Sequence, residues 1–192
     1  MTSRELLNIL HVAERLKDAV RHCDTSGGRR ESVADHSWRL ALMAFFLRDA
    51  FPDADMDKVV RMCLIHDLGE AFTGDIPTFR KSQADVKAED DLFLGWVDSF
   101  PEPQRSQWRD LLSEMNALST RDAKIYKALD KMEAVISHDE SDLSTWLPLE
   151  YDLQLTYGRE NVTFSPWFTA LKAAVDRWTR EKIEGGTDRD QP

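Results

Sequence analysis

The sequence has little cysteine and no long apolar run. Its two cysteines, Cys23 and Cys63, are too few for a disulfide framework and form no C-x-x-C pair. This usage is typical of reduced thiols in a cytoplasmic protein. No apolar run approaches the ~20 residues that a membrane-spanning helix needs. The polar start of the chain also differs from a signal peptide. We therefore expect neither a disulfide-rich secreted protein nor a membrane protein.

Positive charge is also scarce. The 25 Lys and Arg residues are outnumbered by 35 Asp and Glu residues, which gives a formal net charge of −10. Such a chain would repel the phosphate backbone, so a nucleic-acid polymer is not an expected partner. Small anionic ligands remain compatible with the sequence wherever arginines gather. The length of 192 residues and the 42% hydrophobic content predict a single domain over residues 1–184, with a disordered tail over 185–192.

Apolar residues recur at helical spacing along most of the chain, and the period-two alternation of strands is absent. A short segment rich in Gly, Ser and Thr, residues 22–30, is typical of a loop. The sequence therefore predicts an all-α fold. The expected helices cover residues 6–21, 32–47, 55–65, 82–99, 104–118, 120–137, 149–157 and 165–184.

Three acidic residues and a histidine lie close together in one stretch, CLIHDLGEAFTGDIP over residues 63–77. It places His66, Asp67, Glu70 and Asp75 among apolar or small neighbours. His66 falls on the core-facing side of the expected helix, and Asp67 follows it directly. An ionised carboxylate in such a place is costly unless it is paired or bound to a metal. The stretch is thus the first candidate for a functional site.

Metal-competent residues lie on the apolar stripes of three expected helices, at His36, at His66 with Asp67, and at Asp130. Two imidazoles and two carboxylates form a mixed nitrogen and oxygen set, which suits Mn, Fe, Co, Ni or Zn better than Ca or Mg. The alternative interpretation is that these are hydrogen-bonded histidines and paired acids of an ordinary core. Spacing alone leaves both interpretations open.

The wider pattern resembles the HD-domain metal-dependent phosphohydrolases, and among them the 5′-deoxyribonucleotidase branch. The resemblance runs from about Leu6 through Asp130, and residues after about Ser141 add little to it. Its most specific parts are ESVADHS over 31–37, H-D-x-x-E-x-x-x-G-D-x-P over 66–77, and L-D-K over 129–131. It implies an all-helical HD-domain bundle, one catalytic divalent metal and a homodimer. The implied reaction is hydrolysis of (deoxy)nucleoside 5′-monophosphates to nucleoside and phosphate.

The resemblance also assigns roles to matching residues. His36, His66, Asp67 and Asp130 are the implied metal ligands. Glu70 matches the catalytic carboxylate, although a helix carboxylate facing solvent is the alternative interpretation. The remaining matches are Asp75, which would bind the sugar or merely cap a turn, and Arg21, which would bind the phosphate.

Two further positions carry open alternatives. Arg29 and Arg30 either assist the phosphate or form a solvated charged face. The bacterial deoxyribonucleotidases have a Trp directly after the phosphate-binding arginine, whereas this chain has His22. His22 either lies near the sugar, where it would weaken discrimination against ribonucleotides, or lies in the loop without a ligand contact.

Three other functions are alternatives to this expectation. A guanosine polyphosphate hydrolase of the same superfamily typically has a second acid after the one at Glu70, but Ala71 follows here. A cyclic-nucleotide phosphodiesterase would need extra histidines, and none lies between His66 and His138. A nucleotide-sensing module would bind nucleotides without turning them over, and only an assay separates it from an enzyme.

Overall fold

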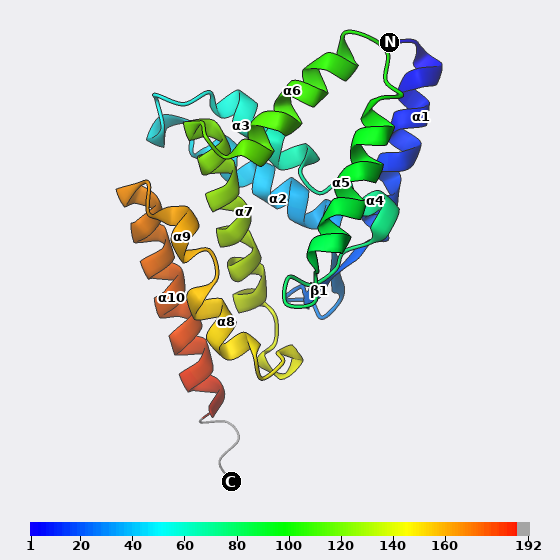
Figure 1. Cartoon of the computed structure of the whole chain (residues 1–192). Helices are drawn as coiled ribbons and strands as arrows, with labels where there is room; N and C mark the ends of the chain where they lie inside the picture. Colours follow the sequence, from blue (N-terminus) through cyan, green and yellow to red (C-terminus); the bar gives the residue numbers. More distant parts are fainter. Residues whose placement is uncertain (188–192) are drawn as a thin grey trace.

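The computed structural model describes residues 1–187, which form a helical protein with one short hairpin (Figure 1). The all-α fold class is therefore confirmed. The expected tail over 185–192 falls partly within helix α10, which continues to Thr187. The rest of that tail lies outside the described residues.

The described elements follow one another in this order: α1 (Ser3–Ala13), a 3₁₀ turn (Glu14–Lys17), β1 (Val20–Asp24), β2 (Arg30–Ser32), α2 (Val33–Phe46), a 3₁₀ turn (Arg48–Ala50), α3 (Met56–Ile65), α4 (Glu70–Thr73), α5 (Gln83–Val97), α6 (Gln104–Ala117), α7 (Arg121–Glu140), a 3₁₀ turn (Leu143–Thr145), α8 (Glu150–Thr156), α9 (Arg159–Val162) and α10 (Pro166–Thr187).

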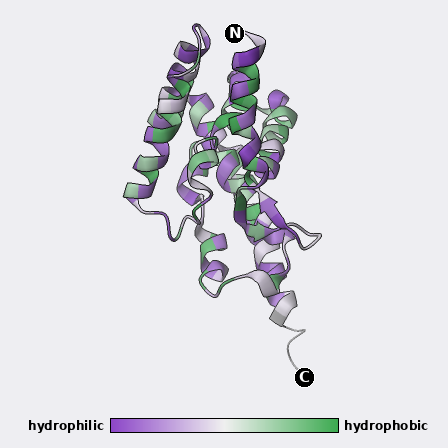
Figure 2. Cartoon of the chain, turned by 90° about the vertical axis from the view of Figure 1, so that its right-hand side faces the viewer, coloured by the Kyte–Doolittle hydropathy of each residue, from purple (hydrophilic) through white to green (hydrophobic). Residues whose placement is uncertain are grey.

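The core lies where α2, α3 and α7 pack against one another. Each contributes an apolar stripe at helical spacing, and Leu40, Val59, Met62 and Leu129 are fully buried there. Helices α8, α9 and α10 pack together, and α9 and α10 also contact α7, with α10 running beside it (Figure 1). Hydrophobic and hydrophilic residues alternate along the helical ribbons, as amphipathic helices require (Figure 2). None of the helices in residues 1–187 is both long and apolar enough to cross a bilayer.

The start of α2 fixes the first expected ligand. Ser32 and Asp35 form a capping box, in which the Asp35 amide donates to Ser32 Oγ (3.1 Å) and the Ser32 amide donates to Asp35 Oδ2 (2.9 Å). This pair satisfies amides that the helix itself leaves unbonded. His36 follows directly, so it sits on the first turn of α2 and enters the core beside α7.

The prediction for the first helix was wrong at its end. The helix was expected to reach about Arg21, but α1 ends at Ala13 and β1 begins at Val20. The hairpin turns at the expected loop, where the Thr25 amide donates to the Arg29 carbonyl (2.8 Å) and Gly28 adopts φ +80°. Glycine supplies that conformation without strain. Pairing with β2 therefore overrides the helical spacing of the preceding residues.

Candidate active site

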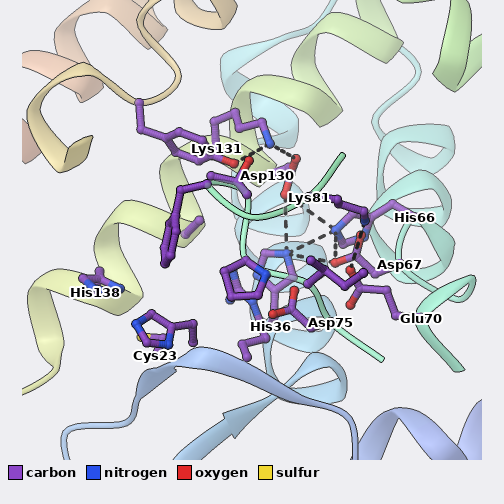
Figure 3. Close-up of a pocket in the computed structure, with 18 of the residues that line it drawn as sticks. Cys23, His36, His66, Asp67, Glu70, Asp75, Lys81, Asp130, Lys131 and His138 are labelled. Atoms are coloured by element: carbon purple, nitrogen blue, oxygen red, sulfur yellow. Dashed lines mark hydrogen bonds and ion pairs between the residues drawn. The ribbon is translucent and has the colours of Figure 1, made fainter. Parts of the chain in front are cut away.

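Four side chains converge between α2, α3 and α7 (Figure 3). His36 comes from α2, His66 ends α3, Asp67 follows it, and Asp130 comes from α7. The Nε2 atoms of His36 and His66 lie 3.1 Å apart, and Asp67 Oδ2 lies 3.7 and 2.9 Å from them respectively. Asp130 Oδ1 lies 3.5 Å from His36 Nε2 and 3.6 Å from His66 Nε2. The structure thus brings together the four residues expected to bind a metal.

In its neutral form, each imidazole would present Nε2 without a proton to this cluster. His66 Nδ1 lies 2.9 Å from the Cys63 carbonyl oxygen, so Nδ1 carries the proton and donates it. His36 Nδ1 contacts the carboxylate of Glu133, which fixes the same tautomer. In the neutral rings the two Nε2 lone pairs then face each other at 3.1 Å. Two lone pairs at that distance repel unless a cation lies between them.

The donor set fits a divalent transition metal. Ligand atoms about 2.0–2.2 Å from one ion lie roughly 3.0–3.5 Å from one another, which matches the observed separations. The cluster also attracts positive charge. Burial alone would lower the pKa of His66, but Asp67 and Asp130 raise it to about 10. A site with both imidazole and carboxylate ligands suits Mn, Co, Fe, Ni or Zn.

Glu133 is a residue that the sequence analysis missed. It is fully buried on α7, one turn after Asp130, and its carboxylate contacts His36 Nδ1. Arg39 Nε donates to Glu133 Oε1 (2.7 Å), and Ser137 Oγ donates to the same oxygen (2.9 Å). Burial alone would raise the pKa of Glu133, but His36 and the nearby arginines lower it to about 2. The sequence signal that could have indicated Glu133 is its position three residues after Asp130, on the same side of the helix.

Positive side chains line the same cavity. Arg21 on β1 lies between two acids, with its Nη1 2.6 Å from Glu31 Oε2 and 3.4 Å from Glu133 Oε2. On α7, Lys127 Nζ lies 2.9 Å from Asp130 Oδ2, and Lys131 Nζ lies 3.3 Å from the same oxygen. The sequence analysis predicted Arg21 but not the two lysines, whose spacing beside Asp130 alone did not distinguish them from a solvated face.

Glu70 opens α4 at the edge of the cluster and is 5% exposed. It therefore does not face solvent, contrary to the alternative interpretation of its position. Burial, and then the charges of Asp67 and Asp75, raise the pKa of Glu70 to about 9, while Lys81 opposes them. Lys81 Nζ lies 3.8 Å from Glu70 Oε1. Glu70 Oε2 is buried without a hydrogen-bond partner among the described residues. The raised pKa favours the protonated form of this carboxyl group at neutral pH.

The two expected sugar contacts also line the cavity, Asp75 after α4 and His22 on β1. Burial raises the pKa of Asp75. The His22 ring packs edge-on against Phe79 with centroids 5.6 Å apart, and its Nε2 lies 3.5 Å from Glu150 Oε1. His22 therefore belongs to the cavity wall and not to the loop of the hairpin.

Arg29 and Arg30 lie elsewhere. Both are exposed at the hairpin, and neither lines the cavity of the cluster. Arg29 Nη1 lies 2.7 Å from Asp35 Oδ2, and Arg30 Nε lies 3.3 Å from Asp24 Oδ1. In this structure Arg29 forms an ion pair at the start of α2, and Arg30 forms one within the hairpin.

An all-helical bundle with an H…HD…D cluster defines a class of metal-dependent phosphohydrolases. The chain belongs to the HD domain family, whose model matches residues 13–172. The curated proteins that it resembles are 5′-deoxynucleotidases. It is 30% identical to the human 5′-deoxynucleotidase HDDC2 over 142 residues, which cover 72% of this chain and 69% of that protein. The same enzyme of Bos taurus is 29% identical over 142 residues, covering 72% and 68%.

A solved structure shows the same fold. A predicted metal-dependent phosphohydrolase of Magnetospirillum magnetotacticum MS-1 superposes with a TM-score of 0.78 and 25% identity, covering 95% of this chain and 93% of that chain. The fold, the family and the cluster agree, and the chain is a metal-dependent phosphohydrolase related to the 5′-deoxynucleotidases.

Proposed function

We propose that this protein hydrolyses (deoxy)nucleoside 5′-monophosphates to nucleoside and phosphate. The observation that carries the proposal is one cavity of about 410 Å³ that joins the metal-type cluster to Arg21, Glu70, Asp75 and His22. A phosphate at the cluster would leave room for a nucleoside along the same cavity. The activity printed in the names of the related enzymes supports this substrate class.

In this proposal His36, His66, Asp67 and Asp130 hold one divalent ion, which is Mn, Co, Fe, Ni or Zn. When bound, such an ion lowers the pKa of a water molecule and supplies a nucleophile at neutral pH. Glu133 keeps His36 in the tautomer that binds the ion. The buried surroundings of the cluster strengthen each of these electrostatic interactions.

The basic residues of the cavity bind the phosphate. Arg21 already lies between Glu31 and Glu133, so its side chain is held in place before a ligand arrives. Lys127 and Lys131 add positive charge beside Asp130. Fixed positive groups of this kind stabilise the charge on the phosphoryl oxygens in the transition state.

Glu70 is the general acid of the proposed reaction. Its carboxyl group is protonated at neutral pH because burial and neighbouring acids raise its pKa to about 9. It can therefore donate a proton to the leaving 5′ oxygen of the nucleoside. Asp75 lies two residues after α4 ends at Thr73. It would accept a hydrogen bond from a sugar hydroxyl.

A homodimer is also part of the proposal. Helix α2 exposes an apolar stripe at helical spacing, with Trp38, Leu42, Phe45 and Phe46 exposed by 63%, 36%, 55% and 74%. A contiguous exposed patch of this kind is typical of a protein interface. Phe46→Glu should therefore shift the sedimentation coefficient to that of a 22.1 kDa monomer. A monomeric parent would contradict the dimer.

A cytoplasmic location completes the proposal. Cys23 and Cys63 are both free and buried, and burial raises the pKa of the Cys23 thiol to about 12. Unreactive, unpaired thiols suit a reducing compartment.

A substrate panel tests the proposed reaction. Metal-stripped protein would receive one divalent ion at a time, and free phosphate would be measured from nucleoside 5′-monophosphates, guanosine polyphosphates and cyclic nucleotides. We expect phosphate release from the monophosphates. Nucleotide binding without turnover of any of these would instead support the sensing module.

A further inference from the structure

The cavity continues beyond the metal cluster to helix α8. Three residues of α8 and the residue that directly follows the helix line the cavity at positions i, i+3, i+4 and i+7, namely Glu150, Leu153, Gln154 and Tyr157. This spacing places them on one side of the helix. None of the four takes part in the proposed hydrolysis, and the family resemblance seen in the sequence adds little here.

The two ends of this face reach the two ends of the cavity. At one end, Lys131 Nζ donates to Tyr157 Oη (2.7 Å) and also lies 3.3 Å from Asp130 Oδ2, beside the cluster. At the other end, the buried carboxylate of Glu150 lies 3.5 Å from His22 Nε2 and 3.3 Å from His138 Nε2. Seven residues of helix span about 10 Å. Figure 3 shows His138 well away from His66 and Asp67.

The middle of this face carries polar groups without protein partners. Gln154 is 6% exposed, and its side-chain amide makes no hydrogen bond with any described residue. Its backbone carbonyl accepts from Lys172 Nζ (3.1 Å), so the helix is tied to α10 at this residue. His138 Nε2 is also buried without hydrogen-bonding geometry, despite its 3.3 Å distance from Glu150. A buried nitrogen such as His138 Nε2 is costly unless a ligand or water pairs with it, and the Gln154 amide is likewise left to pair with a ligand.

We propose that the inner face of α8 binds the nucleobase, with the Gln154 amide as its hydrogen-bond reader. The inference rests on the proposed function, because that function places the phosphate at the metal end. The base then lies along this face, against Gln154. An amide both donates and accepts, so it pairs with a base edge that offers a donor next to an acceptor.

The test compares each nucleotide with an ester that lacks the base. It measures kcat/KM for dAMP, dGMP, dCMP, dTMP and deoxyribose 5-phosphate in the parent, Gln154→Leu and Gln154→Glu. The control variant is Gln107→Leu, an exposed glutamine on α6. We expect the parent to favour its best nucleotide over the ester. That ratio should fall roughly fivefold in both Gln154 variants, which corresponds to about 1 kcal/mol for one neutral hydrogen bond.

An unchanged ratio in both Gln154 variants overturns the inference, and a fall in Gln107→Leu does so as well. If the parent releases phosphate from none of these compounds, the proposed function has failed, and calorimetric binding of dAMP and deoxyribose 5-phosphate decides the inference. Tighter binding of dAMP that is lost in Gln154→Leu supports it. Equal affinity of the parent for both compounds overturns it.

Discussion

The histidines at the two ends of the cavity differ in how completely they are paired. At the metal end, each histidine Nδ1 has an acceptor, at Cys63 or at Glu133, and Glu133 is itself held by Arg39 and Ser137. At the α8 end, His138 has no hydrogen bond through Nε2, and the Gln154 side chain makes none with a described residue.

This difference separates the two tasks of an enzyme. The histidines that would hold the ion are kept in one geometry before the substrate arrives, because reorganisation would add to the barrier. Groups that recognise the variable part of a substrate stay open until the substrate pairs with them. The four predictions below act on one end or the other, and the expected effect decreases from the first to the last.

The largest effect is expected from Asp67→Asn, because the neutral amide removes a ligand and a charge from the cluster. Bound metal measured by elemental analysis should drop below one tenth of the parent, since even outer-shell partners cost roughly 10–100-fold. Phosphate release should be nearly abolished, because the bound ion supplies the nucleophile. Asp110→Asn on the exposed face of α6 is the control. Full metal occupancy in Asp67→Asn would remove Asp67 from the ligand set.

Glu70→Gln should lower kcat by roughly 10²–10⁴-fold while the bound metal stays, because the amide cannot act as a general acid. The parent should also lose activity as the pH rises through the pKa of Glu70. On the alkaline side of the pH profile, this loss should be centred at or below about pH 9, since a nearby divalent ion favours the ionised form of Glu70. Glu160→Gln on α9 serves as the matched control. An unchanged kcat and alkaline limb in Glu70→Gln would assign the proton to another group.

Glu133→Gln tests how much the contacts that Glu133 makes with His36, Arg21 and Arg39 contribute to metal affinity. The amide can still accept from His36 Nδ1, but it loses the charge that Arg21 and Arg39 neutralise. We expect metal affinity to fall about 10-fold, at the low end for such partners. A competition titration with a chelating dye measures it. An affinity equal to that of Glu160→Gln would make Glu133 a purely structural residue.

His22→Trp is expected to leave turnover of dAMP intact and to change only the choice of sugar. A large apolar ring would leave a 2′-hydroxyl without partners, at a cost of about 1–3 kcal/mol. The ratio of kcat/KM for dAMP to that for AMP should therefore rise by roughly tenfold over the parent. His11→Trp, on the exposed side of α1, controls for the added ring. If the parent already prefers dAMP strongly and His22→Trp leaves the ratio unchanged, another residue reads the sugar.

The sequence indicated the four residues of the metal end only when helical spacing was joined to the family resemblance, and it did not indicate the α8 end. The apolar stripes of three helices, and the capping box before His36, are local patterns that determine which side of a helix faces the core. Glu133 was hidden because a buried acid at helical spacing looks like any other helix carboxylate. The hairpin that carries Arg21 and His22 depends on pairing between two segments, which residue spacing does not show. Gln154 depends on how α8 docks against α10 and the cavity, a tertiary contact with no motif of its own.

The central claim is that one divalent ion at this cluster is needed for phosphate release from a nucleotide. The most direct measurement adds a transition metal stepwise to stripped parent protein, with dAMP present, and follows free phosphate. The account predicts no release from the stripped protein, and a rate that rises to a plateau at one ion per chain. Release from the stripped protein, or a plateau only at two ions per chain, would contradict it.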